Sequence, residues 1–136
     1  MQNYGKSVFD LDANLVALLC YIANFVCYLG LVLSIITIIQ DKSNKLARFH
    51  AWQSILLLIA PLALVIVWVI FAFVGVFIDA AIGIPILSIL SMLLYFLLLL
   101  SGLAAFVGMI IAAIKAYNGE LFKLPVIGGF ADRFSN

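Results

Sequence analysis

The sequence predicts an all-α integral membrane protein, a helical bundle with three transmembrane helices. Hydrophobic residues make up 68% of the 136-residue chain, charged residues make up 10%, and the mean hydropathy is +1.33. A soluble domain carries about a quarter charged residues, which help to cover its surface. The uncharged stretches 13–40, 49–78 and 80–114 each exceed the ~20 residues that a spanning helix needs. We therefore expect lipid to surround most of the chain, as a single transmembrane domain of residues 1–136.

The first predicted span covers residues 14–39. Its apolar run is longer than the ~7–15-residue core of a signal peptide, and two acidic residues precede it, so we expect it to remain as a signal-anchor. Asn24 lies near the middle of this span. An amide in hydrocarbon needs a hydrogen-bond partner, so Asn24 predicts a contact with another helix, and a ligand contact is the alternative.

A basic loop, residues 40–50, separates the first span from the second. A short interfacial helix start is expected at 44–53, leading into the second span at 51–78. Aromatic rings beside cations are typical of the headgroup level of a bilayer. The segment therefore contacts lipid headgroups, a peptide or another subunit, or it is a solvated helix start. The candidate headgroup or partner contacts, with two tail residues included, are Lys45, Arg48, Phe49, His50, Trp52, Gln53, Tyr117 and Pro125.

A short turn joins the second and third spans. Pro61 inside the second span predicts a kink, and Gly83 and Pro85 mark the turn. The third span covers residues 85–114. Asp79 at the turn is expected to be a boundary residue in contact with water. The alternative, a proton or cation relay, requires a position at mid-membrane.

Small residues recur along the third span at every fourth position. This spacing lets two helix backbones approach closely, which strengthens dispersion contacts where no hydrophobic effect operates. We expect tight packing against a partner helix, either in this chain or in another one. The residues assigned to helix packing are Asn24, Ala104, Gly108, Ala112 and Ala116.

Lysine and arginine are unevenly distributed along the chain. The loop 40–50 and the tail 115–136 hold three each, the N-terminal arm holds one, and the turn 79–85 holds none. With three spans, the loop and the tail share one side of the membrane, and the positive-inside rule makes that side the cytoplasm. The N-terminus is then expected outside, and the location is a bacterial or archaeal cell membrane.

No catalytic or metal-binding cluster is recognisable, so we expect no enzyme activity, no cofactor and no metal. The chain has one histidine, His50, without a Ser–His–Asp, Cys–His or HExxH arrangement. Cys20 and Cys27 would lie about 10 Å apart along a helix, which is too far for a disulfide. The expected partners are the lipid bilayer and other membrane subunits or a second copy of the chain, and no nucleic acid.

Two blocks of the sequence carry a family resemblance. The segment RFHAWQSILL at 48–57 opens a membrane helix, and a tail block follows after two hydrophobic spans. The tail block consists of Tyr117, Gly119, Glu120, Pro125, Ile127, Ala131 and Arg133. Together they resemble a family of small prokaryotic membrane proteins of unknown function, distantly related to the chloroplast inner-envelope protein-import component of the Tic translocon. The resemblance covers about residues 15–134 and implies membrane placement with a paired cytoplasmic face; the chloroplast relatives have four spans, against the three predicted here.

The predicted function is that of a non-enzymatic polytopic membrane protein, an assembly or accessory component, or a protein-translocation component in the version that the resemblance implies. One alternative is a small oligomeric channel or transporter, in which Asn24, Ser91 and Ser101 would line a wet pore. The other is a lipid-acting membrane enzyme that uses His50 and Arg48.

Overall fold

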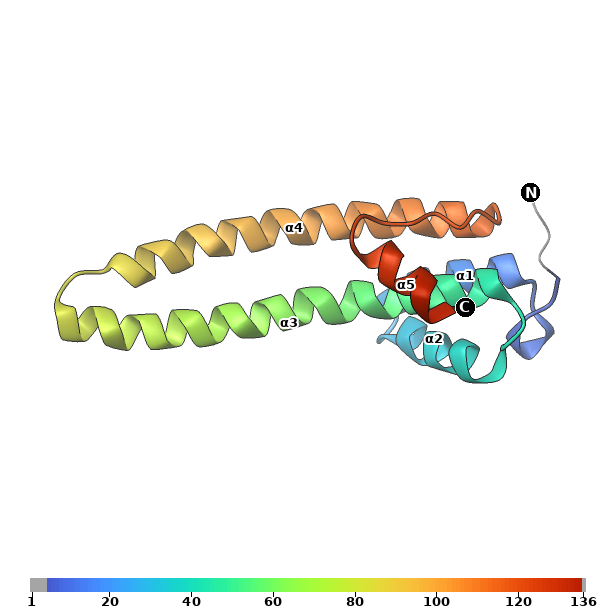
Figure 1. The fold of residues 1–136 in the computed structure, drawn as a ribbon, viewed down its shortest axis with the longest axis horizontal. Helices are drawn as coiled ribbons and strands as arrows, with labels where there is room; N and C mark the ends of the chain where they lie inside the picture. Colours follow the sequence, from blue (N-terminus) through green and yellow to red (C-terminus); the bar gives the residue numbers. More distant parts are fainter. Residues whose placement is uncertain (1–4, 136) are drawn as a thin grey trace. The chain divides into compact units, whose positions relative to one another are not determined.

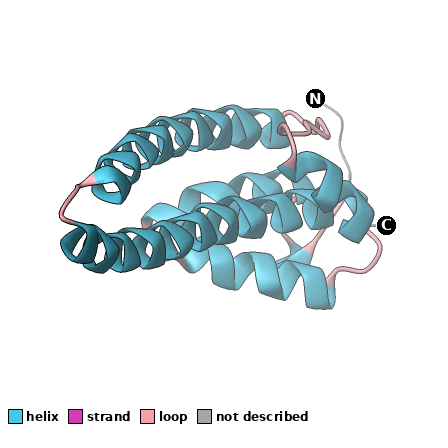
Figure 2. Ribbon diagram, turned by 60° about the vertical axis from the view of Figure 1, so that its left-hand side comes forward, coloured by secondary structure: helices cyan, strands magenta, loops and turns pink. Residues whose placement is uncertain are grey.

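The computed structural model describes residues 5–135, and the parts of the predicted arm and tail at 1–4 and 136 lie outside the described residues. The described chain consists of helices and loops (Figure 2), with one isolated bridge between Lys6 and Asp12. It divides into two compact units, a first unit of residues 1–57 and 107–136 and a hairpin unit of residues 58–106. The helices in chain order are α1 (Ala13–Ile22), α2 (Leu29–Gln40), α3 (Lys45–Ile82), α4 (Ile86–Tyr117) and α5 (Ile127–Ser135), with short 3-10 turns at Val8–Asp10 and Ala23–Phe25.

Two of the described helices, α3 and α4, are long and apolar enough to cross a membrane (Figure 1). α3 contains the predicted span 51–78, and α4 contains all of the predicted span 85–114 except Pro85, so both are confirmed as helices of spanning length. The helix start predicted at 44–53 is the beginning of α3, which runs unbroken from Lys45 through Pro61 to Ile82. All five helices together confirm the all-α class.

The prediction of one continuous helix over 14–39 is wrong. This segment forms α1, a 3-10 turn and α2, with the backbone reversing at Val26–Tyr28, where Cys27 and Tyr28 adopt positive φ values of 47° and 58°. The two helices then pack against each other. With 10 and 12 residues, they are about 15 and 18 Å long, too short for the ~30 Å of a hydrocarbon core. A third span is therefore not confirmed.

Close packing at Gly30 explains why α2 folds back onto α1. A Cβ atom at this position would lie 2.6 Å from the Cys20 carbonyl oxygen and 2.5 Å from Oδ1 of Asn24. Only glycine permits this approach of the α2 backbone to α1. The reversal also changes the expected topology, because Ser7 in the N-terminal arm donates a hydrogen bond to Asp41, next to α3. The placement of the arm and the 40–50 loop on opposite sides of the membrane is thus not supported.

The core of the first unit is built from small and branched residues. Val16 and Cys20 of α1 pack with Ala47 and Ala51 of α3, and Leu33 of α2 covers them. Small side chains at these positions allow the helices to approach closely. The core therefore joins the α1–α2 pair to the first turns of α3.

The hairpin unit exposes large apolar side chains along both of its helices, as is expected of a surface in contact with lipid. Asp79 lies in the last turns of α3 and caps α4. Its carboxylate accepts hydrogen bonds from the backbone N–H groups of Leu87 (3.0 Å) and Ser88 (2.7 Å), and from the Ser88 hydroxyl (2.6 Å). Also in the hairpin unit, the Trp68 indole N–H of α3 donates to the Ser91 carbonyl oxygen of α4 at 2.9 Å. The predicted contact of Asp79 with water is therefore wrong: the side chain is buried, because its carboxylate is used to connect the two helices.

Candidate functional site

Three polar side chains, Tyr21 on α1 and His50 and Gln53 on α3, lie in the first unit with no exposed surface. We call these three residues the polar clamp. His50 and Gln53 are three residues apart and so share one face of α3. Burial of such groups costs free energy unless each finds a hydrogen-bond partner. The partners identify what the clamp holds.

The polar clamp binds the backbone of the segment between α4 and α5. The Gln53 amide nitrogen donates to the Tyr21 hydroxyl (3.0 Å) and to the Phe122 carbonyl oxygen (3.2 Å). The Gln53 amide oxygen accepts a hydrogen bond from the Leu124 N–H at 3.2 Å. One side chain therefore holds both a donor and an acceptor of the tail backbone, as a neighbouring β-strand would.

His50 completes the clamp as a neutral imidazole. Its Nε2 lies 3.0 Å from the Glu120 carbonyl oxygen, which can only accept, so the ring proton is on Nε2. Its Nδ1, 2.9 Å from the Tyr21 hydroxyl, is then the acceptor. Proton donation runs in one direction, from Gln53 through Tyr21 to His50 and on to Glu120. The Phe122 N–H also donates to the Glu120 carbonyl oxygen at 2.9 Å, so the clamp holds a segment that makes a tight turn at Leu121.

A second buried contact joins α1 to α3. Asn24 donates to the Ser54 hydroxyl at 3.0 Å and to the Cys20 carbonyl oxygen at 3.1 Å, and the Ser54 hydroxyl donates to the same carbonyl at 2.6 Å. The structure thus places Asn24 in contact with another helix of the same chain. Like the clamp, this contact uses polar groups inside the first unit.

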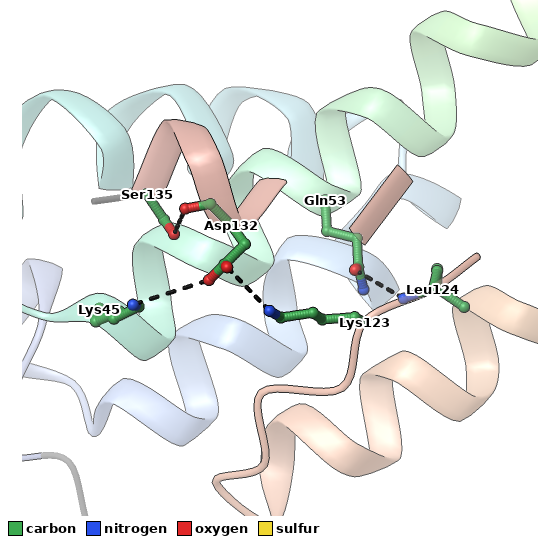
Figure 3. A network of polar contacts seen from close by, with 6 residues as sticks. All are labelled: Lys45, Gln53, Lys123, Leu124, Asp132 and Ser135. Atoms are coloured by element: carbon green, nitrogen blue, oxygen red, sulfur yellow. Dashed lines mark hydrogen bonds and ion pairs between the residues drawn. The ribbon is translucent and has the colours of Figure 1, made fainter. Parts of the chain in front are cut away.

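An ionic network holds α5 to the start of α3 (Figure 3). The Asp132 carboxylate lies 2.9 Å from the Lys123 ammonium and 3.8 Å from that of Lys45, and the Ser135 hydroxyl donates to the Asp132 carbonyl oxygen at 3.1 Å. The hydrogen bond from Lys123, with the positive charges of Lys123 and Lys45, lowers the pKa of Asp132 below its ordinary value. These ion pairs are partly exposed, and we attribute to them orientation of α5 more than stability.

The predicted contact residues fall into two groups. Phe49, His50 and Gln53 are fully buried, so in this structure they contact the chain's own interior and tail rather than headgroups. The other group lies at or near the surface. Arg48 donates to the Lys42 carbonyl oxygen (3.2 Å), and the Trp52 ring lies 5.1 Å from that of Phe134.

The two predicted tail contacts remain at the surface. The Tyr117 side chain is exposed while its carbonyl oxygen accepts a hydrogen bond from Asn14 at 3.0 Å. Pro125 is exposed and follows Leu124, the last residue that Gln53 holds. The structure therefore brings the segments 42–54 and 115–133 together, as the paired face of the sequence prediction requires.

The small-residue stripe of α4 meets different surroundings along its length. Ala112 and Ala116 are fully buried in the first unit, whereas Ala104 is exposed. At Gly108 an added Cβ would lie 3.1 Å from a methyl group of Leu124. The neighbour at this position is thus the returning tail and not another helix.

Tyr21 of the clamp was not among the residues predicted from the sequence. A tyrosine hydroxyl inside an apolar run needs a polar partner, and this requirement could have identified it.

Comparison with known proteins identifies the family. Residues 12–131 match the magnetosome magnetite crystal formation protein family. The chain belongs to this family. Among individual members, it is 35% identical over 134 residues to a UPF0132 membrane protein of Methanocaldococcus jannaschii, with 96% of each chain covered. It is also 30% identical to a UPF0132 membrane protein of Archaeoglobus fulgidus, over 77% of this chain and 84% of the relative.

A second UPF0132 membrane protein of Methanocaldococcus jannaschii is 29% identical over 91% of this chain and 71% of the relative. No solved structure matches the chain. The membership in a family of small prokaryotic membrane proteins, which the 48–57 block predicts, is thereby confirmed, and the chain is a membrane protein. The relation to the chloroplast import component is not shown by these comparisons.

Proposed function

We propose that this family member is a non-enzymatic accessory or assembly component of a cell membrane, with its recognition surface on one membrane face. The observation that carries the proposal is the polar clamp. It uses the buried polar groups of the first unit to fix α1, α3 and the tail as one folded body. A protein that presents a rigid surface to a partner needs such a body, and the apolar hairpin supplies its attachment to the bilayer.

The proposal includes a one-sided topology. Ser7 contacts Asp41, and Asn14 contacts Tyr117, so the N-terminal arm, the loop before α3 and the end of α4 share one face of the membrane. The α1–α2 pair then enters the bilayer from that face and returns to it. All seven Lys and Arg residues lie outside the hairpin unit and fall on this face, which the positive-inside rule makes cytoplasmic.

Cysteine labelling tests this topology. In a Cys27→Ala background, which keeps only the fully buried Cys20, one cysteine at a time replaces exposed Lys6, Lys42 or Ile84. Intact cells then receive a membrane-impermeant maleimide. We expect Ile84→Cys, in the turn of the hairpin, to react from outside, and the other two to react only after permeabilisation. Reaction of Lys6→Cys in intact cells would show the opposite placement of the arm and refute the one-sided topology.

The accessory role is tested by isolation of the full chain in mild detergent, with mass measurement and identification of proteins that co-purify. We expect a defined complex, either with other subunits or with further copies of the chain. The wild-type chain is compared with the variant Gln53→Leu, in which the clamp is opened. We expect this variant to remain in the membrane but to lose the complex. A monomer without partners, in both detergent and lipid nanodiscs, contradicts the role.

The side-chain contacts favour this proposal over a channel or a lipid-acting enzyme. Asn24 is bonded to Ser54 and Cys20, and the Ser101 hydroxyl donates to the Leu98 carbonyl oxygen at 2.8 Å. Both ring nitrogens of His50 are in hydrogen bonds inside the first unit. Protein-free liposomes and liposomes with the purified chain should therefore show equal ion conductance, and His50→Ala should leave lipid composition unchanged.

Two narrower roles are compatible with an accessory component. A protein-translocation role is supported by the resemblance at 48–57 alone. The family description names magnetite crystal formation, but the described residues include no group of three or more His, Cys, Asp or Glu side chains that could hold a metal ion. The proposal accordingly rests on the architecture and not on mineral binding.

A further inference from the structure

The geometry points to a second contact with the bilayer: the outward face of α5 lies in the headgroup region of the cytoplasmic leaflet, with Arg133 at a lipid phosphate. This face consists of Val126, which precedes the helix, together with Gly129, Phe130, Arg133 and Phe134. The inference depends on the chain being a membrane protein, and its choice of the cytoplasmic leaflet rests on the one-sided topology proposed above; it does not depend on the accessory role.

The depth of the tail is given by its contacts with α4 and α3. After α4 ends at Tyr117, the chain turns back toward α5 (Figure 1). Leu124 then lies against Gly108, nine residues back along α4. At 1.5 Å per residue this is a return of about 13 Å along α4, away from its charged end and toward its apolar part. Leu124 also contacts Gln53, eight residues into α3. The start of α5 therefore lies near the boundary between water and hydrocarbon.

The two faces of α5 differ in the way an interfacial helix requires. Gly128, Ala131 and Ser135 are buried and face inward. Outward, Val126 is 80% exposed, and Phe130 and Phe134 are about half exposed at 49% and 50%. Water would solvate these apolar side chains poorly, whereas the region between headgroups and acyl chains accommodates them.

The charge on the outward face matches a phospholipid. Arg133 is exposed and has no hydrogen bond or ion pair with any described residue, while the inward Asp132 is paired with lysines. Val126, Gly129, Phe130 and Arg133 surround an open hollow of about 170 Å³. The Arg133 guanidinium at the edge of this hollow can bind the phosphate of a phospholipid, while the apolar part of the same lipid lies in the hollow.

The experiment measures the depth of residue 129 in lipid. A Cβ at Gly129 meets open space, so Gly129→Cys accepts a bimane label while the apolar residues remain. The full chain, in a Cys27→Ala background, is placed in vesicles of phosphatidylcholine and phosphatidylglycerol that carry bromine on the upper acyl carbons. We expect bromolipid to quench this label at least twofold more than a label at Lys42→Cys in the exposed loop, and aqueous iodide to show the reverse order.

Arg133 is tested in the same labelled chain. Arg133→Glu should reduce bromolipid quenching at residue 129 at least twofold, and Arg133→Lys should retain it. Proteolysis after Lys123 separates a loss of lipid contact from a loss of the clamp, because a detached tail is cleaved faster. Equal iodide quenching at residues 129 and 42 would overturn the inference, as would protection from both quenchers, which would indicate a second protein copy on this face.

Discussion

Replacement of Gln53 by leucine tests the polar clamp most directly. Leucine has nearly the volume of glutamine, so the substitution removes hydrogen bonds without creating a cavity. Gln53 is fully buried and bonds to the backbone of both Phe122 and Leu124. Tyr21 keeps its hydrogen bond to His50 in the variant. The variant also loses the hydrogen bond from Gln53 to the Tyr21 hydroxyl, so its two lost tail contacts are read out at residues 120–124.

The expected loss follows from the two backbone groups that remain buried. A carbonyl oxygen and an N–H without partners cost about 1–3 kcal/mol each, so the free energy of tail detachment falls by at least about 2 kcal/mol. Because every 1.4 kcal/mol is a factor of ten, amide exchange in residues 120–124 should accelerate about 30-fold if it proceeds through local opening.

Hydrogen exchange followed by mass spectrometry, with the chain in nanodiscs, measures this opening. The matched control is Gln40→Leu, which makes the same chemical change at an exposed position at the end of α2. The control should leave exchange in residues 120–124 at the wild-type rate. If Gln53→Leu also leaves that rate unchanged, the hydrogen bonds of Gln53 do not hold the tail, and the account of the clamp is refuted.

Three further predictions concern glycine packing, the carboxylate of α5 and the hairpin turn. Gly128→Ala should destabilise the docked tail by about 1–3 kcal/mol, since its Cβ would lie 2.6 Å from the Lys123 Cα. Gly129→Ala faces open space and should stabilise α5 by up to about 1 kcal/mol. Thermal unfolding of the two variants measures this difference. The pKa of Asp132 is lower in the folded protein than in the unfolded chain. The carboxylate therefore stabilises the docked α5 fully at pH values above its unfolded pKa, and this stabilisation is lost as the pH falls through its folded pKa. Proteolysis after Lys123 should accelerate at acid pH in the wild type and lose this step in Asp132→Asn. Asp79→Ala should accelerate amide exchange at the first turn of α4, while unchanged exchange there would exclude a capping role.

The two long helices could be predicted from the sequence because their uncharged apolar stretches are long enough to span a membrane. In residues 58–106 one charged side chain, Asp79, interrupts the apolar residues, and few structures other than a helical hairpin bury so many backbone groups in lipid. The turn at Gly83 and Pro85 was equally readable. The start of α3 within 44–53 was predicted as well, whereas its packing into a folded unit with α1 and the tail was not.

The break in the first apolar segment could not be predicted from local sequence. The reversal uses Cys27 and Tyr28 at positive φ, where glycine or asparagine is usual. The feature that stabilises it is Gly30, whose role depends on the position of the α1 backbone after folding. Tertiary packing thus overrides a segment that is apolar and long enough to span.

The sequence predicted the side chains of the candidate site on α3 but not the backbone groups that they bind. The sequence predicted His50 and Gln53 as contact residues at the start of an apolar helix, and Tyr117 and Pro125 as contact residues in the tail. The tail partners of His50 and Gln53 are backbone groups of Glu120, Phe122 and Leu124, which have no signature in side-chain chemistry. Such a contact is found only when the path of the tail is known.

The turn between α3 and α4 bears on how the chain is inserted by the cell. In the one-sided topology the ribosome delivers a hairpin from which a single ionised group, the Asp79 carboxylate, is carried to the far side. A cell interior at negative potential repels this anion outward, contributing about 2.3 kcal/mol for each 100 mV of potential. The membrane potential therefore assists translocation of the turn across the bilayer. It also opposes export of any of the seven Lys and Arg side chains, so the same potential favours this orientation over the reverse one.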